Sequence, residues 1–176
     1  MFDAKPLRRL FPVLLLNLIA FAVAIPILPA LADELGGTAT DIGFLFATQA
    51  FGQFLMAPVW GDVSDRFGRK WTLVATIAAG ATFELVTAFV TQLWVLYVAR
   101  LMVGMCAGNI GTASALIADA TEPEERSQGM AIIGISFGIG FTIGPAVGGA
   151  ISLLPETYPA WFPPGPGPLG AGLPFV

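Results

Sequence analysis

The chain has 176 residues, of which 56% are hydrophobic and 11% are charged, and its formal net charge is −4. Its mean hydropathy of +0.79 is too high for a soluble domain, in which only about 45–50% of residues are apolar. It contains no histidine and a single cysteine, Cys106, which excludes histidine metal ligands, Ser-His-Asp catalysis and a disulfide framework. No nucleophile–base set, metal-ligand cluster or nucleotide-binding loop is visible, so we expect no enzyme, cofactor, metal or nucleic-acid partner.

Apolar stretches long enough to cross a bilayer, which takes about 20 residues, follow one another along the chain. They cover residues 10–32, 41–60, 70–91, 94–118 and 128–153. Seven of the eight basic residues lie before the first stretch, between the second and third, or between the fourth and fifth. Because cytoplasmic loops are enriched in Lys and Arg, this pattern predicts an all-α polytopic membrane protein with a cytoplasmic N-terminus.

The last part of the sequence has a different composition. Residues 154–176 hold seven of the fourteen prolines and four glycines, a composition that disfavours a helix. We therefore expect a helical membrane domain over residues 1–153, followed by an extracytoplasmic loop or a truncated tail over 154–176.

The charged decapeptide at 61–70, between the second and third stretches, reads Gly-Asp-Val-Ser-Asp-Arg-Phe-Gly-Arg-Lys. It resembles the signature loop between the second and third helices of the major facilitator superfamily, Gly-x-x-x-Asp-Arg-x-Gly-Arg-Arg/Lys. The alternative is a generic basic cytoplasmic loop. The resemblance implies a conformational latch, whose charges bond neighbouring helix ends in one state and release them in another. The latch residues would be Gly61, Asp65, Arg66, Gly68, Arg69, Lys70 and, as the expected partner of Arg69, Asp119.

Members of this superfamily usually have twelve spans in two six-helix halves. The resemblance therefore implies five helices of the N-terminal half-bundle, with the C-terminal half-bundle missing and the chain truncated. A genuine five-span protein is the alternative. The implied location is a bacterial inner (plasma) membrane.

The fifth stretch is rich in glycine. Its ending, Gly-x-x-x-Gly-Pro-x-x-Gly-Gly, is similar to the motif of the superfamily's drug:proton antiporter branch, and comprises Gly140, Gly144, Pro145, Gly148 and Gly149. Glycines four residues apart leave a thin helix face that another backbone can approach closely. Ordinary close packing is the alternative explanation for this pattern.

Arg100 lies inside the fourth stretch, four residues before Gly104. An arginine in hydrocarbon is costly unless it faces partners or water, and the superfamily's similar Arg-x-x-x-Gly motif implies a role in the transport cavity and in proton coupling. Snorkelling to the outer surface is the alternative. Glu84 in the third stretch sits at nearly equal depth, so the two side chains either form an ion pair or Glu84 is a neutral packing residue.

Three amides complete the candidate cavity residues. Two prolines, Pro26 and Pro29, resemble those in the first span of tetracycline antiporters, where an acidic residue stands nine positions before the first proline. Here that position is Asn17, which cannot carry a proton but can bond a substrate. Gln49 and Gln53 lie on one face of the second stretch and either line the cavity or bond other helices.

The sequence therefore predicts a proton-coupled exporter of drugs or small molecules that works by alternating access. Its partners would be the lipid bilayer, a small-molecule substrate and protons. A metabolite symporter or uniporter of the same superfamily, or a non-transporting fragment, are the alternatives.

Overall fold

The computed structural model describes residues 5–108, 110–124 and 126–152, and the side chains of residues 5–9 and 152 lie outside this description. The predicted Pro- and Gly-rich tail also lies outside the described residues. All regular elements that the structure describes are helices, as predicted. They are α1 (Lys5–Glu34), α2 (Ala39–Phe67), α3 (Arg69–Thr87), α4 (Leu93–Ala107), α5 (Ile110–Ala120) and α6 (Arg126–Ser152).

Four helical segments of the described chain are long and apolar enough to cross a membrane. They are Leu10–Glu34, Ala39–Phe67, Leu93–Ala120, which joins α4 to α5, and Arg126–Ile151. Helix α3 is not among them, because its 19 residues include two basic residues, four threonines and Glu84. A membrane crossing by α3 thus remains a prediction from the apolar stretch at residues 70–91.

The charged stretch 61–70 is mostly helical, so the prediction of a loop there is wrong. Helix α2 continues to Phe67, and the single residue Gly68 separates it from α3. The last turns of α2 are stabilised by an ion pair between Asp62 and Arg66 at 3.1 Å and by a bond from the Ser64 hydroxyl to the Gly61 carbonyl at 2.8 Å. Gly68 has φ 94°, a conformation that a residue with a side chain adopts only with strain.

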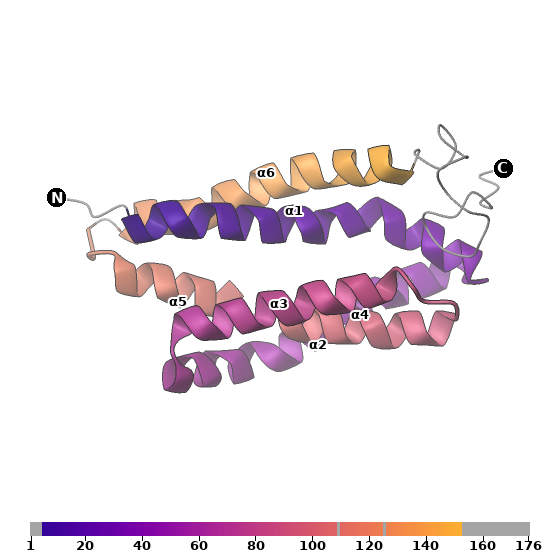
Figure 1. Ribbon diagram of the computed structural model, residues 1–176, viewed down its shortest axis with the longest axis horizontal. Helices are drawn as coiled ribbons and strands as arrows, with labels where there is room; N and C mark the ends of the chain where they lie inside the picture. The colour runs from indigo at the N-terminus through magenta and orange to yellow at the C-terminus, as the bar shows by residue number, and fades with distance from the viewer. Residues whose placement is uncertain (1–4, 109, 125, 153–176) are drawn as a thin grey trace.

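The helices form two layers (Figure 1). Helices α1 and α6 lie side by side in one layer, while α2, α3 and α4 pack against one another in the other. Helix α5 contacts both α3 and α6 and so joins the layers near one end. The start of α1, the α2–α3 junction and the α5–α6 connection lie at that same end, and the α1–α2 and α3–α4 connections lie at the other (Figure 1).

Glycines bring α6 into close contact with α1. A Cβ atom added at Gly140 would lie 2.9 Å from the Leu18 Cβ, and one at Gly148 would lie 2.5 Å from the Val23 carbonyl oxygen. A Cβ at Gly144 would overlap the Ala22 Cβ. These three glycines lie four residues apart on one face, so the α1–α6 contact depends on the absence of side chains there.

The α2–α4 contact is built in the same way. A Cβ at Gly104 would overlap the Gln49 carbonyl, and one at Gly52 would lie 2.7 Å from the Leu101 carbonyl oxygen. Each layer therefore contains one pair of helices whose backbones lie in close contact, α1 with α6 and α2 with α4.

We expect Gly144→Ala to destabilise the chain by about 1–3 kcal/mol, because the added methyl group would force α1 and α6 apart. Gly138→Ala is the matched control: it lies on the same helix, and nothing lies within 4 Å of the added carbon. Thermal unfolding in detergent measures both variants. Equal stability of the two variants would contradict the close contact between α1 and α6.

Candidate functional site

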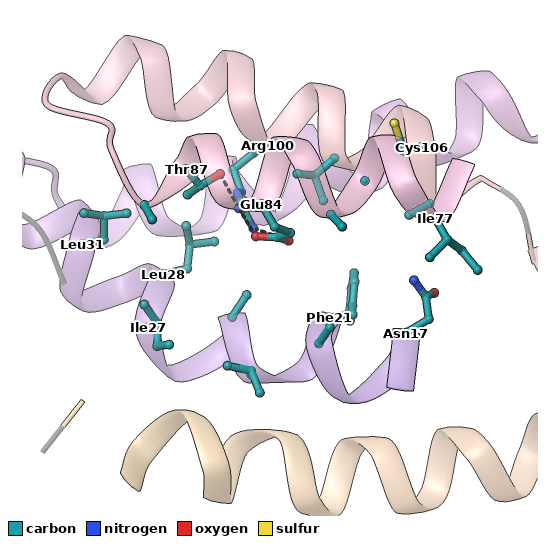
Figure 2. Close-up of a pocket in the computed structure, with 18 of the residues that line it drawn as sticks. Asn17, Phe21, Ile27, Leu28, Leu31, Ile77, Glu84, Thr87, Arg100 and Cys106 are labelled. Atoms are coloured by element: carbon teal, nitrogen blue, oxygen red, sulfur yellow. Dashed lines mark hydrogen bonds and ion pairs between the residues drawn. The ribbon is translucent and has the colours of Figure 1, made fainter. Parts of the chain in front are cut away.

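A cavity of about 720 Å³ lies between α1 on one side and α3 and α4 on the other (Figure 2). Most of its lining is apolar, and α6 contributes only Ile151. The polar residues along it are Asn17, Glu34, Thr76, Glu84, Thr87 and Arg100. A cavity of this size and character fits a drug-sized molecule with few polar groups.

The Glu84 and Arg100 side chains form an ion pair in the wall of this cavity (Figure 2). Arg100 Nη2 donates to Glu84 Oε2 at 2.7 Å, and Nη1 donates to Oε1 at 3.3 Å. Arg100 is only 1% exposed, so it does not snorkel to the surface. The pairing follows from the antiparallel α3–α4 hairpin, which brings residues at similar distances from its turn to the same depth.

Thr87 is a third member of this group, which sequence reasoning missed. Its hydroxyl accepts a bond of 2.8 Å from Arg100 Nη2. Thr87 follows Glu84 by three residues on α3, and residues at this spacing share a helix face. That spacing was the available signal, although a threonine in a membrane helix more often bonds only its own backbone.

The three amide residues divide between the cavity and the helix contacts. Asn17 lines the cavity from α1 (Figure 2). Gln49 and Gln53 do not line it: Gln49 is buried, and the backbone carbonyls of these two residues approach Gly104 of α4 and Gly108, the residue that follows α4. Neither glutamine is among the residues that line the cavity, and a role of their amides in contacts between helices stays a prediction.

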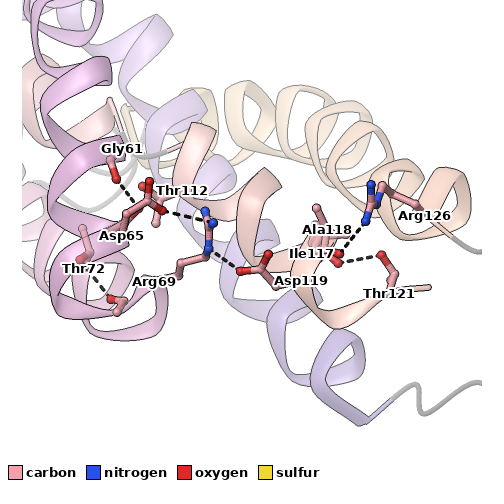
Figure 3. Close-up of polar contacts among 12 residues, drawn as sticks. Gly61, Asp65, Arg69, Thr72, Thr112, Ile117, Ala118, Asp119, Thr121 and Arg126 are labelled. Carbon is pink, nitrogen blue, oxygen red and sulfur yellow. Dashed lines mark hydrogen bonds and ion pairs between the residues drawn. The ribbon is translucent and has the colours of Figure 1, made fainter. Parts of the chain in front are cut away.

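The second group of predicted site residues lies at the α2–α3 junction (Figure 3). Arg69 Nε lies 2.5 Å from Asp119 Oδ2, and its Nη2 lies 3.2 Å from Asp65 Oδ1. Arg69 therefore joins the end of α2 and the start of α3 to the end of α5. We call Asp65, Arg69 and Asp119 the junction cluster. The contact expected between Arg69 and Asp119 is present, while its action as a latch stays a prediction.

The remaining charges of this region make contacts outside the junction cluster. Arg66 bonds Asp62 within α2, and both side chains are exposed. The Lys70 ammonium lies 5.6 Å from the centre of the Trp71 ring, close enough for a cation–π contact. Neither Arg66 nor Lys70 joins α5 through these contacts.

We expect Arg69→Ala to loosen α5 from α3, because it removes both ion pairs of a side chain that is only 28% exposed. Amide hydrogen exchange over residues 110–120 should accelerate roughly fivefold, as the loss of about 1 kcal/mol predicts. Arg66→Ala is the control, since its ion pair with Asp62 stays within α2. Unchanged exchange in Arg69→Ala would show that the junction cluster does not hold α5.

Comparison with known proteins identifies the family of this chain. The model of the major facilitator superfamily matches residues 10–171. The chain is 33% identical over 126 residues to the class C tetracycline resistance protein of Escherichia coli, and 34% identical over 127 residues to the class B protein. Each of these alignments covers 70% of this chain and 32% of the relative.

A human relative extends the comparison. The chain is 33% identical over 165 residues to major facilitator superfamily domain-containing protein 10 of Homo sapiens, an alignment that covers 75% of this chain and 36% of the relative. The chain thus spans about a third of the length of the curated relatives it matches. Together with the apolar helices, these matches identify an integral membrane protein of a transporter family. The chain belongs to the major facilitator superfamily.

Proposed function

We propose that this chain forms part of a proton-coupled exporter of drugs or other small molecules. The observation that carries the proposal is the Glu84–Arg100 pair in the wall of a largely apolar cavity. Ionisable residues inside membrane spans are costly and commonly belong to substrate or proton pathways. The similarity to tetracycline resistance proteins supports a drug as the substrate.

Transport would proceed by alternating access. In secondary transporters, two helical bundles rock about a site near the middle of the membrane and open it to one side at a time. The second bundle would come from a C-terminal half. The junction cluster would act as the latch, with the Arg69–Asp119 contact closed in one state and released in the other.

The proton would bind to a carboxylate of the cavity. Asn17 cannot take this role because its amide does not titrate. Glu84 is the best candidate, since its side chain is 30% exposed and lines the cavity. The alternatives lie at the end of α1: Glu34, which also lines the cavity, and its neighbour Asp33, which does not. Protonation of Glu84 would remove the counter-charge of Arg100, and this change would link proton binding to a rearrangement of α3 against α4.

The orientation follows from the basic residues. Four basic residues lie at the end of α2 or the starts of α3 and α6, namely Arg66, Arg69, Lys70 and Arg126. These helix ends lie where α5 joins the two layers (Figure 1). By the positive-inside rule this end faces the cytoplasm and the α3–α4 connection faces outward. A bacterial inner membrane is the location we propose, because the tetracycline resistance relatives come from bacteria.

Two other functions fit the same fold. A metabolite symporter or uniporter would use a similar cavity, and a fragment that inserts without a second half would not transport. The coding sequence beyond Val176 separates these alternatives: six further spans favour a transporter, and a stop codon favours a non-transporting remnant.

We expect Glu84→Gln to abolish proton release on drug binding while changing the drug Kd less than about threefold. The amide keeps the size of the side chain but cannot release a proton. Purified protein in detergent is mixed with tetracycline as the probe, and a pH indicator records the release. Glu124→Gln, the same change at an exposed position outside the cavity, is the control. Release at the wild-type level in Glu84→Gln would refute the carrier role of Glu84.

A further inference from the structure

The guanidinium of Arg100 is bound by two acceptors on the same face of α3. Its Nη2 donates to Glu84 Oε2 at 2.7 Å and to Thr87 Oγ1 at 2.8 Å (Figure 2). An Nη group of arginine carries two hydrogens, so these two bonds satisfy both. The rotation of the guanidinium is therefore fixed by Thr87 as well as by the ion pair.

The Thr87 hydroxyl is itself held in one orientation. It donates its single hydrogen to the Phe83 carbonyl oxygen at 2.9 Å, one turn earlier on α3. With that hydrogen engaged, a lone pair of the oxygen accepts from Arg100. Thr87 is only 7% exposed, so water does not compete freely for either bond.

The two charged side chains differ in their access to the cavity. Arg100 is 1% exposed, and its Nε has no hydrogen-bond partner among the described residues. The Glu84 side chain is 30% exposed. A molecule or a proton that enters the cavity therefore meets the carboxylate, while the guanidinium lies behind it.

We propose that Thr87 is a positioning residue: it holds the guanidinium plane of Arg100 so that both Nη groups stay on Glu84 and the carboxylate faces the cavity. The proposal rests on the proposed function of this pair in coupling. It adds a residue whose hydroxyl, and not its bulk, sets the geometry of the pair.

The test replaces the hydroxyl at nearly constant volume. In Thr87→Val, one Nη2 hydrogen of Arg100 loses its acceptor. We expect the exchange of the Arg100 Nη hydrogens with water to accelerate about tenfold, as the loss of one bond from a charged donor predicts. NMR of arginine side chains labelled with ¹⁵N in the purified chain in detergent measures this rate. Thr87→Ser keeps the hydroxyl and should restore a rate close to the wild-type value.

Thr82→Val is the matched control on the same helix. Its exposed hydroxyl donates only to its own backbone, at the Ala78 carbonyl, so exchange at Arg100 should not change. An unchanged rate in Thr87→Val, an equal acceleration in Thr82→Val, or a failure of Thr87→Ser to restore the rate would each overturn the proposal. If Thr87→Val does not fold, Thr87→Ala removes the same acceptor and carries the same expectation.

The exchange measurement uses neither drug nor transport, so the two proposals fail separately. If exchange behaves as expected and Glu84→Gln still releases protons like the wild type, then Thr87 positions a pair that does not carry the coupling proton. If exchange is unaffected while Glu84→Gln abolishes proton release, the proposed function stands and the role of Thr87 is wrong.

Discussion

The rest of this structure depends on the neutralisation of Arg100. An unpaired guanidinium in hydrocarbon costs several kcal/mol, and removal of one partner from a buried pair destabilises a protein by about 3–5 kcal/mol. Glu84 supplies the opposite charge from α3, a helix that is not apolar enough to be identified as a span by composition. The pair therefore stabilises the packing of α3 beside α4 at this depth, because each charged side chain lowers the free-energy cost of burying the other. The pair itself is electrically neutral overall, with the carboxylate as its exposed part.

Close backbone contact sets the frame around this pair. Glycines on α6 meet α1, and glycines on α2 and α4 meet each other, so each layer holds a pair of helices with little freedom to separate. Polar contacts add to the α2–α4 pair at both of its ends. The Tyr97 hydroxyl donates to Asp41 Oδ1 at 3.0 Å, and the Trp60 indole donates to the Met105 carbonyl at 2.5 Å in the last turn of α4. The cavity lies between α1, which belongs to the first of these pairs, and α3 and α4 of the other layer.

The sequence was sufficient to predict the features that follow from periodicity and charge. The helical fold and the close packing of the Gly144 face follow from spacing along one helix, while the contact of Arg69 with Asp119 is implied by the resemblance to the superfamily. The spacing of Glu84 and Arg100 also placed them at equal depth, but the pattern could not decide between an ion pair and a neutral packing residue. That choice depends on the rotation of α3 about its axis, which the positions of neighbouring helices determine.

Other features could not be predicted because a residue type allows several partners. A glutamine in a membrane helix looks the same in the sequence whether it faces a ligand or another helix. Only the close approach of the Gln49 backbone carbonyl to Gly104 shows that this turn of α2 contacts α4. The Thr87 hydroxyl donates to a carbonyl of its own helix, as many membrane threonines do. The bond that it accepts from Arg100 forms only because the α3–α4 hairpin brings the two residues together. The helical course of residues 61–67 does not follow from charge density, which favours a loop between membrane spans, whereas the Asp62–Arg66 pair at i and i+4 stabilises a helix.

For the Glu84–Arg100 pair to lie within the membrane between two crossing helices, α3 must span the bilayer. Cysteine labelling in a Cys106→Ala background tests this directly, with a membrane-impermeant reagent applied to one face of sealed vesicles. Arg66→Cys and Thr91→Cys place single reporters before and after α3. We expect the two positions to be labelled from opposite faces, position 66 from the cytoplasmic side and position 91 from the outside. Labelling of both positions from the same face would contradict it, because α3 would not cross and the pair would not lie in the membrane.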